Sequence, residues 1–453
     1  MKLQNIIKPV LVATILFFSL VSCLENKFGT VDLDLEEDGK EEVSYTYNHP
    51  CAMYNDDDFT RVKTAIAAGA GDVYTEFTNL KATAYAQLAY DPNPQTQIVR
   101  GDVTGTDYSS ENYVYAMKDA AAAYQQALLW KLTDNDDYAA NAIDILNQWA
   151  ATCIEIKSND ANHYLASGCQ GYTFANAGEL LRDYDGWSDS YFTAFKTWMV
   201  DVFAAKNYAF LTKHSDASDT HYWANWDLVN MSSYLAIGIL TEDDDMVNFI
   251  KNYFYEGVGN GCLDKLIVDT HSDPNGSGET IAQCQESGRD QGHATMVAAV
   301  AANLCQMAYT LYLDNQDVPE LDFFAADDNV ILKMCEYTAL FNAKNGLDNA
   351  NSEGSYIVSI TAMPFTSYTA FVGESQEYVQ TQASEDQRGT IRPGWEIIYN
   401  HYAKVKGLGS GYQYTQYFAE KLRPEGGAGD SRYGSNSGAF DQLGWGTLMM
   451  YRE

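Results

Sequence analysis

The chain has 453 residues, 46% of them hydrophobic and 20% charged, which is the composition of a globular protein long enough to bury a sizeable core. It carries 62 Asp and Glu against 28 Lys and Arg, and the formal net charge of −34 argues against nucleic-acid binding and against adhesion to an anionic membrane surface. A polyanionic substrate would therefore need a local basic patch. The 33 tyrosines suit a cleft for flat ligands such as sugar rings, although packing between helices accounts for most aromatic rings.

The N-terminus indicates export. Lys2 and Lys8 accompany an apolar run from Val10 to Val21, which is typical of a secretory signal and too short for a membrane span. The ending Leu-Val-Ser-Cys resembles a bacterial lipobox, in which Cys23 is lipidated; the alternative is a plain signal peptide with a chance cysteine. We therefore expect a signal peptide at 1–22, an anchor and acidic tether at 23–47 and one domain over 48–453. The protein would be held in the outer membrane, on its periplasmic or cell-surface face.

Seven further cysteines follow Cys23. Outside the cytoplasm some could pair, and Cys153–Cys169 and Cys262–Cys284 bracket loop-like stretches, but an odd number leaves at least one free. No pair has CxxC spacing, so the sequence does not support a zinc ribbon.

From about 56 to 345 the pattern is helical, with apolar residues at three-to-four spacing and few prolines. The expected helices are Phe59–Ala68, Tyr74–Ala89, Tyr113–Leu132, Tyr138–Ile154, Thr173–Arg182, Ser190–Ala205, Trp226–Leu240, Asp245–Tyr255, His293–Leu313 and Asn329–Phe341. Short connections between helices of similar length favour helical hairpins, arranged as an open solenoid or a closed α/α toroid.

The character of the chain changes after about 346. Ser355–Ile360 and Tyr368–Val372 are expected to be short strands or extended segments, and a helix near Trp395–Val405 precedes Gly-rich loops at 407–411 and 426–438. The fold class predicted for the whole is mainly α, with a C-terminal part rich in loops and short strands that packs on the helical body.

Four segments concentrate polar residues where a core would not favour them. They are His221–Asp227, Glu286–His293, Arg392–Tyr402 and, more weakly, Gln170–Asn176. If the helix after the second segment begins early, Glu286, Arg289 and His293 lie on one face. The structural alternatives are a capped helix start, an ion-paired cap and ordinary amphipathic packing.

Asn, His, Arg and Tyr without a tight carboxylate pair suit eliminative cleavage of a uronate polymer. The C5 proton of a uronate lies beside a carboxylate, so the enzyme must stabilise the intermediate with hydrogen-bond donors aimed at that carboxylate. Tyr or His can remove the proton and return one to the departing O4. Hydrolysis would instead require two positioned carboxylates, which 62 acidic residues leave open.

Several motifs resemble the alginate lyase superfamily: Asn48-His49-Pro50, Asn225-Trp226-Asp227-Leu228, ESGRDQGH over 286–293 and RPGWEIIYNHY over 392–402. The resemblance implies an incomplete α/α toroid that cleaves alginate or a related polyuronate, such as glucuronan, by β-elimination. Two departures are Cys51, where the family often has Gly, and Asp219-Thr220-His221, where some members have Asn-Asn-His. The neutralising Asn must then come from elsewhere.

The resemblance also implies roles for residues. Asn225 and His293 match the pair that neutralises the carboxylate, Arg289 is a further donor, and His221 is an alternative neutraliser or base. Tyr399 is the expected catalytic tyrosine, with Tyr172 and Tyr222 as competitors. The other expected substrate-binding residues are Gln170, Asn176, Trp223, Trp226, Glu286, Arg392, Trp395 and His401. The basic patch is expected among Arg100, Arg182, Arg289, Arg388 and Arg392.

No cofactor is expected to be required, although zinc or calcium is an option. The expected partner is an anionic polysaccharide, bound by a monomer that meets the membrane only through its anchor. Three alternatives stay open: a glycoside hydrolase using Glu286 and Asp227, a non-catalytic glycan-binding lipoprotein, and a zinc-dependent lyase using His221, His293 and His401. Endo or exo action would depend on loops among 260–285 and 407–438.

Overall fold

The computed structural model describes residues 43–106, 110–344, 354–370 and 377–453. The predicted signal peptide, the lipidated Cys23 and the tether as far as residue 42 lie outside the described residues. The last part of the predicted tether packs on the domain, because the Tyr45 hydroxyl donates to Asn248 at 2.7 Å and the Tyr47 hydroxyl to Asp244 at 2.9 Å. The folded unit thus begins at Val43.

All ten helices expected between 56 and 345 are present, with shifted ends. The helices are α1 Asp56–Ala67, α2 Asp72–Ala82, α3 Tyr113–Thr133, α4 Asp136–Thr152, α5 Asn162–Leu181, α6 Asp189–Trp198, α7 Ala205–Lys213, α8 Ala224–Thr241, α9 Asp244–Glu256, α10 Leu263–Leu266, α11 Gln291–Asp314, α12 Ala326–Asn342, α13 Trp395–Asn400, α14 Gln413–Leu422 and α15 Gly446–Met449. A π-helical turn over Met199–Ala204 joins α6 to α7, and another over His401–Val405 continues α13.

The largest difference from expectation is at the start of α5, which begins at Asn162 rather than near Thr173. Glycines at 168 and 171 weaken the helical pattern of the sequence. In the structure these glycines let α5 approach α8: a Cβ at Gly168 would lie 2.6 Å from Val229 Cγ2, and one at Gly171 would lie 2.1 Å from Ser233 Oγ. Packing between helices therefore outweighs the local propensity.

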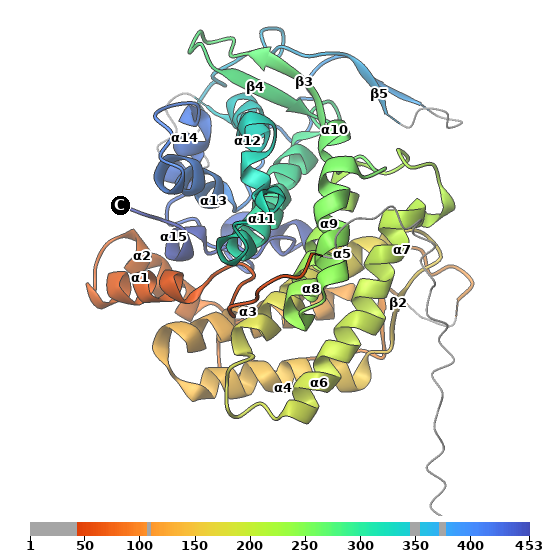
Figure 1. The fold of residues 1–453 in the computed structure, drawn as a ribbon. Coiled ribbons are helices and arrows are strands. Elements are labelled where there is room, and N and C mark those ends of the chain that lie inside the picture. The colour runs from red at the N-terminus through yellow and green to blue at the C-terminus, as the bar shows by residue number, and fades with distance from the viewer. Residues whose placement is uncertain (1–42, 107–109, 345–353, 371–376) are drawn as a thin grey trace, which may run out of the picture. The chain divides into compact units, whose positions relative to one another are not determined.

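The helices form two layers (Figure 1). Along the inner layer α3 packs against α5, α5 against α8, and α8 against α11, and these helices are buried on most of their circumference. The outer helices, such as α4 and α9, bury one face only. A helix that is apolar all round must be covered on every side, whereas an amphipathic helix can face water. This two-layered arrangement of antiparallel helices is that of the predicted α/α toroid.

Among the described residues, α11 is long and apolar enough to cross a membrane by length and composition. The protein buries 83% of its most apolar stretch, however, and neighbouring helices cover it. We therefore assign α11 to the core.

Three two-stranded sheets decorate the helices. β1 Gln97–Val99 pairs in parallel with β2 Glu155–Lys157. β3 Ile267–Ser272 pairs antiparallel with β4 Thr280–Cys284, and β5 Tyr368–Ala370 pairs antiparallel with β6 Tyr378–Gln380. The β3–β4 hairpin stands where the sequence suggested only a loop. Of the two alternatives for Ser355–Ile360, a regular strand is wrong, since that stretch is irregular apart from a bridge between Tyr356 and Lys344.

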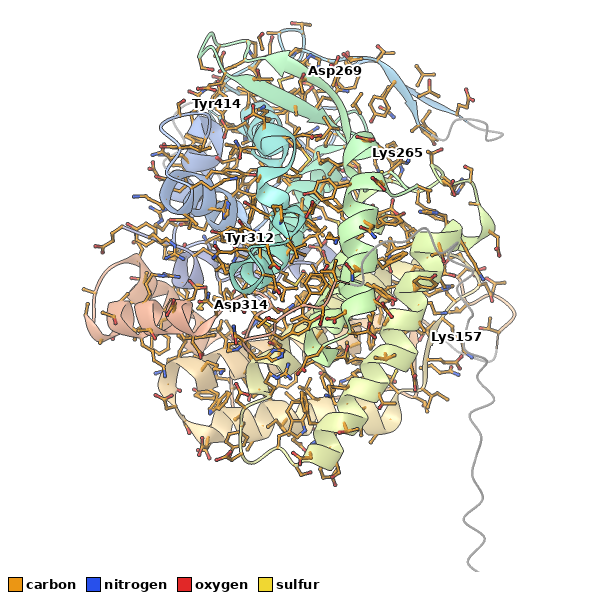
Figure 2. All side chains as sticks on the ribbon, in the orientation of Figure 1. Lys157, Lys265, Asp269, Tyr312, Asp314 and Tyr414 are labelled. Atoms are coloured by element: carbon orange, nitrogen blue, oxygen red, sulfur yellow. The ribbon has the colours of Figure 1, made fainter. Side chains whose placement is uncertain are left out.

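Side chains fill the space between these elements (Figure 2). Tyr414 on α14 donates its hydroxyl to Asp273, which follows β3, at 3.0 Å and so ties the hairpin to the helical body. The seven cysteines among the described residues are all buried free thiols, so the pairs that the sequence left open do not form.

Candidate active site

A cavity of about 100 Å³ opens between the first turns of α8 and α11, the middle of α5 and the C-terminal part of the chain. It is lined by Arg100, Leu165, Cys169, Gln170, Asn225, His293, Met296, Arg392, Ser437, Gly438 and Asp441. Asn225 and His293 lie within the first three residues of helices of 18 and 24 residues. The positive ends of two helix dipoles therefore face the cavity and favour an anionic ligand.

His293 is held by the residue that caps its own helix. One carboxylate oxygen of Asp290 accepts the main-chain N–H of His293 at 2.8 Å, and the other lies 2.6 Å from the imidazole Nδ1. Burial alone would raise the pKa of Asp290, but the hydrogen bonds and charge of His293 outweigh it and lower that pKa overall. The ionised carboxylate accepts a hydrogen bond from Nδ1–H, so in the neutral imidazole Nε2 keeps its lone pair. The side chain is 33% exposed and can act as a base.

Two buried amides line the cavity with unmet hydrogen-bonding capacity. Oε1 of Gln170 and Oδ1 of Asn225 have no partner among the described residues, although both residues are at most 3% exposed. The main chain of Asn225 is fixed, since its N–H donates to Glu286 Oε1 at 2.8 Å. Buried polar groups without partners are rare in folded proteins. These two amides are thus placed to bind a polar ligand.

The cavity also contains a buried ion pair. Nη1 of Arg392 lies 2.6 and 2.7 Å from the two carboxylate oxygens of Asp441. Burial raises the pKa of Asp441, while the charges of Arg392 and Arg100 oppose that rise. Arg100 stacks over the Tyr113 ring at 4.7 Å. Among the lining residues, two arginines against one aspartate leave one net positive charge, and the Asp290 carboxylate lies outside the lining beside His293.

The structure thus brings together five residues that the sequence assigned to the site or its basic patch, namely Asn225, His293, Gln170, Arg392 and Arg100. Arg289 lies beside this group but outside the cavity lining, because it pairs with Glu286 at 2.9 Å and stacks on the Trp223 ring at 4.9 Å. The expected shared face of Glu286, Arg289 and His293 is wrong. The helix begins only at Gln291, so the first two residues belong to a turn.

Among the described residues, no tyrosine lines the cavity. Tyr399, the expected catalytic tyrosine, packs its ring against Tyr412 at 5.7 Å. Tyr172 is fully buried and donates its hydroxyl to the main-chain oxygen of Asp441 at 2.7 Å, directly behind the lining. Tyr222 packs against the Trp226 ring at 4.7 Å.

The remaining expected binding residues also lie outside the lining. His221 precedes α8, with its ring 4.8 Å from that of Tyr222, and Asn176 donates to the main-chain oxygen of Tyr172. Trp395 stacks on Phe418 at 4.8 Å, and His401 stacks on Phe324 at 3.8 Å. Two expected members of the basic patch are engaged elsewhere. Arg182 pairs with Glu179 and Glu242, and Arg388 lies between the Phe341 and Tyr356 rings.

The geometry weighs against two of the alternatives. Glu286 and Asp227 are fully buried and bound within the protein, Asp227 by His214 at 3.0 Å and Tyr253 at 3.0 Å, so they do not form an exposed carboxylate pair. His401 lines a different cavity from His293, so the histidines of the zinc hypothesis do not converge.

Within the described ranges, one group has the geometry of metal ligands: His49, Cys51 and Glu179. Arg182 lies 2.8 Å from His49 Nδ1 and 2.9 Å from Glu179 Oε2. A permanent cation therefore already occupies this cluster, which does not fit a second one.

Sequence reasoning missed Asp441 and Met296. Met296 lies one turn beyond His293 on α11, so helical spacing could have found it. Asp441 follows the Gly-rich segment and has no local signal, since only the folding of the C-terminal part onto Arg392 brings it to the cavity.

Comparison with known proteins gives a consistent picture. The family model described as alginate lyase matches residues 78–345, while no curated protein sequence matches the chain. Alginate lyase A1-III from Sphingomonas species A1 is 13% identical with a TM-score of 0.54, over 87% of this chain and 95% of that one. A variant of A1-III complexed with a tetrasaccharide is 12% identical with a TM-score of 0.53, over 89% and 95%. An alginate lyase from Bacteroides ovatus is 12% identical with a TM-score of 0.50, over 82% and 96%. At these identities the likeness shows the fold, and it confirms the predicted α/α toroid.

Proposed function

Because the chain belongs to the alginate lyase family and is a polysaccharide lyase, we propose that it cleaves alginate, as polymannuronate or polyguluronate, by β-elimination in the cavity around His293. The observation that carries this proposal is the convergence of one oriented imidazole, two unsatisfied amides and one net positive charge. A uronate presents a carboxylate, a C5 proton and ring hydroxyls. The positive charge matches the carboxylate, the imidazole matches the proton, and the acceptor oxygens of the two amides match the hydroxyls. A tetrasaccharide bound to a protein of the same fold agrees with a saccharide ligand.

In the proposed reaction the side-chain N–H groups of Asn225 and Gln170 donate to the uronate carboxylate, and the positive charge near Arg392 stabilises the negative charge that develops on it. Nε2 of His293 accepts the C5 proton, while Asp290 stabilises the imidazolium that results. The C5–H electron pair forms the C4–C5 double bond as the C4–O4 bond breaks. The imidazolium then returns its proton to O4, so that the products are an unsaturated uronate and a new reducing end.

This assignment moves the base from the expected Tyr399 to His293, because no described tyrosine lines the cavity. The sequence also offered His221, which lies before α8. Alanine variants of the two histidines are a matched pair, since both remove an imidazole near the first turn of α8. Their rates therefore distinguish the two candidate bases. We expect His293→Ala to lower kcat at least 100-fold and His221→Ala to lower it much less.

The test measures ultraviolet absorbance of the unsaturated product beside a reducing-end assay, on polymannuronate, polyguluronate and glucuronan. A rise in both signals on either alginate polymer supports the proposal, and a faster reaction on glucuronan would replace alginate as the substrate. New reducing ends without absorbance would mean hydrolysis. Full activity of His293→Ala would refute its role as the base.

We further propose that the protein is exported and lipid-anchored at Cys23. It is a monomer, and its activity needs no cofactor. Metabolic labelling with a radioactive fatty acid should mark the wild-type chain and leave a Cys23→Ala chain unlabelled. A chelator should leave the rate of elimination unchanged, whereas loss of activity on chelation would favour a metal-dependent lyase.

A further inference from the structure

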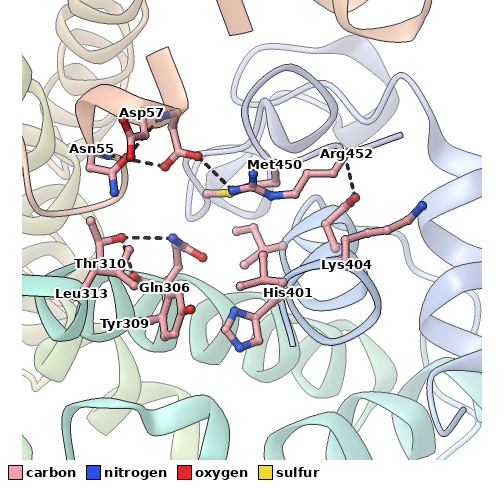
Figure 3. Close-up of a pocket in the computed structure, with 14 residues that line it drawn as sticks. Asn55, Asp57, Gln306, Tyr309, Thr310, Leu313, His401, Lys404, Met450 and Arg452 are labelled. Carbon is pink, nitrogen blue, oxygen red and sulfur yellow. Dashed lines mark hydrogen bonds and ion pairs between the residues drawn. The ribbon is translucent and has the colours of Figure 1, made fainter. Parts of the chain in front are cut away.

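A second cavity, of about 330 Å³, lies at the other end of α11 and is larger than the cavity around His293. Its lining comes from the start of α1, the second half of α11, the turns after α13 and the C-terminus (Figure 3). The volume is at the lower end of the roughly 300–1,000 Å³ typical of small-molecule sites. It is lined by Asn55, Asp57, Asp58, Gln306, Tyr309, Thr310, Leu313, Ile397, Asn400, His401, Lys404, Val405, Met450 and Arg452.

The two cavities are separate. His293 and Tyr309 lie sixteen residues apart on α11, so at about 1.5 Å per residue they are roughly 24 Å apart along the axis. Within the part of the chain that the structure describes, no residue lines both cavities. A ligand at one site therefore does not touch the other.

His401 gives this second cavity an unsatisfied polar wall. Its ring is 3% exposed, stacks on Phe324 at 3.8 Å and meets the edge of Tyr309 at 4.6 Å. Nε2 is buried and has no hydrogen-bond partner among the described residues. Burial, followed by the charges of Lys406 and Arg452, lowers the pKa of His401 well below its usual value. The imidazole is therefore neutral and offers one donor and one acceptor.

The charged side chains of the cavity lining balance, because Asp57 and Asp58 stand against Lys404 and Arg452. Arg61 and Arg452 share one carboxylate oxygen of Asp58, at 2.9 and 3.1 Å, so this triad carries one net positive charge. Lys404 and Asp57 are exposed at the lining, and their opposite formal charges sum to zero. The lining is thus neutral in a chain of net charge −34, and Arg61, outside the lining, adds one positive charge beside Asp58.

The uncharged lining suits a polyhydroxylated ring. The polar part is the amide of Gln306, which donates to the hydroxyl of Thr310 at 3.0 Å. Beside it lie the Tyr309 ring and apolar atoms of Ile397 and Met450. Sugars are bound in this way, by an apolar wall for the ring face and by amide and hydroxyl groups for the hydroxyls.

We propose that this cavity is a second, non-catalytic saccharide site that holds one carboxylate-bearing sugar, a single uronate residue. The proposal rests on the proposed function only in identifying the sugar as a uronate of the kind the enzyme releases. Lys404 binds the carboxylate at the mouth, and His401 and Gln306 face the ring hydroxyls. The site retains a product or a chain end on the enzyme, away from the bond that is cleaved.

Hydrogen exchange measured by mass spectrometry, with mannuronate as the probe and mannose as the neutral comparison, tests this directly. On the full chain, mannuronate should slow exchange in peptides covering 306–313 and 397–405, and mannose should do so at least tenfold more weakly. The measurement needs no turnover, so mannuronate can protect this cavity even in a protein without β-elimination activity. The proposed activity and the proposed second site can therefore be refuted independently.

Two variants identify the residues. Lys404→Ala should weaken mannuronate binding about tenfold through loss of a charge-assisted hydrogen bond, whereas Lys213→Ala, an equally exposed lysine at the end of α7, should not. His401→Phe keeps the ring stack on Phe324, removes both nitrogens and should weaken binding about tenfold. Protection confined to peptides around 225 and 293, equal protection by mannose, or unchanged binding by both variants would overturn the site.

Discussion

Replacing Asp290 by asparagine separates two roles that one side chain performs at the start of α11. Oδ1 caps the helix by accepting the His293 N–H at 2.8 Å, and Oδ2 lies 2.6 Å from the imidazole Nδ1. An asparagine preserves the capping oxygen but presents an amide N–H to Nδ1. The imidazole would then carry its proton on Nε2, which is the wrong tautomer for a base.

The expected cost to activity follows from the lost hydrogen bond. A hydrogen bond to a charged group contributes about 1.5–3 kcal/mol, which corresponds to a fall in kcat of about 10- to 150-fold. Stability should change by less than about 1 kcal/mol, because Asn and Asp cap helices almost equally well and only the charge near the helix dipole is lost. Asp290→Ala is the matched control: it removes the cap as well and should cost about 1 kcal/mol more.

The assay is the initial rate of unsaturated product formation on the preferred polymer, beside the free energy of unfolding in urea for each variant. A wild-type rate for Asp290→Asn would refute the proposal that Asp290 holds His293 in the tautomer that acts as the base. A loss of rate that merely tracks a loss of stability in both variants would show that Asp290 is structural.

Three further variants test the packing around the site. Glu286→Gln removes the buried charge that pairs with Arg289 and should lower the free energy of unfolding by about 2–3 kcal/mol in urea titrations, below the full cost of a wholly buried pair because Arg289 is partly exposed. Gly168→Ala places a Cβ 2.6 Å from Val229 and should cost about 1–3 kcal/mol by the same measurement. Burial, with a neighbouring carboxylate, raises the pKa of Glu425 to about 8, so the folded state binds more protons than the unfolded state. This contribution of Glu425 to stability should fall as pH rises from near 4.5 to about 8. Thermal unfolding of Glu425→Gln across that range should show a shallower slope than the wild type, in which Glu336 and Glu76 add slopes of the same sign.

The sequence by itself determined the class of fold and much of the site. Helical periodicity and capping are local properties, spread over three or four residues, so the ten helices of the body were predictable with small errors at their ends. The same locality marked His221–Asp227 and Glu286–His293 as polar segments that a core would exclude, and the family resemblance singled out Asn225 and His293 within them.

Only the tertiary structure decided which polar residues share a cavity. Gln170 and Arg392 lie far apart in the chain and meet because α5 and the C-terminal part pack on the same ends of α8 and α11. Trp395 and Tyr399 have the composition of a sugar-binding face, yet they pack against Phe418 and Tyr412. An amphipathic pattern states that one face of a helix is covered, but the neighbouring helix determines what covers it. For the same reason Asp441 reached the site without any signal in its own segment.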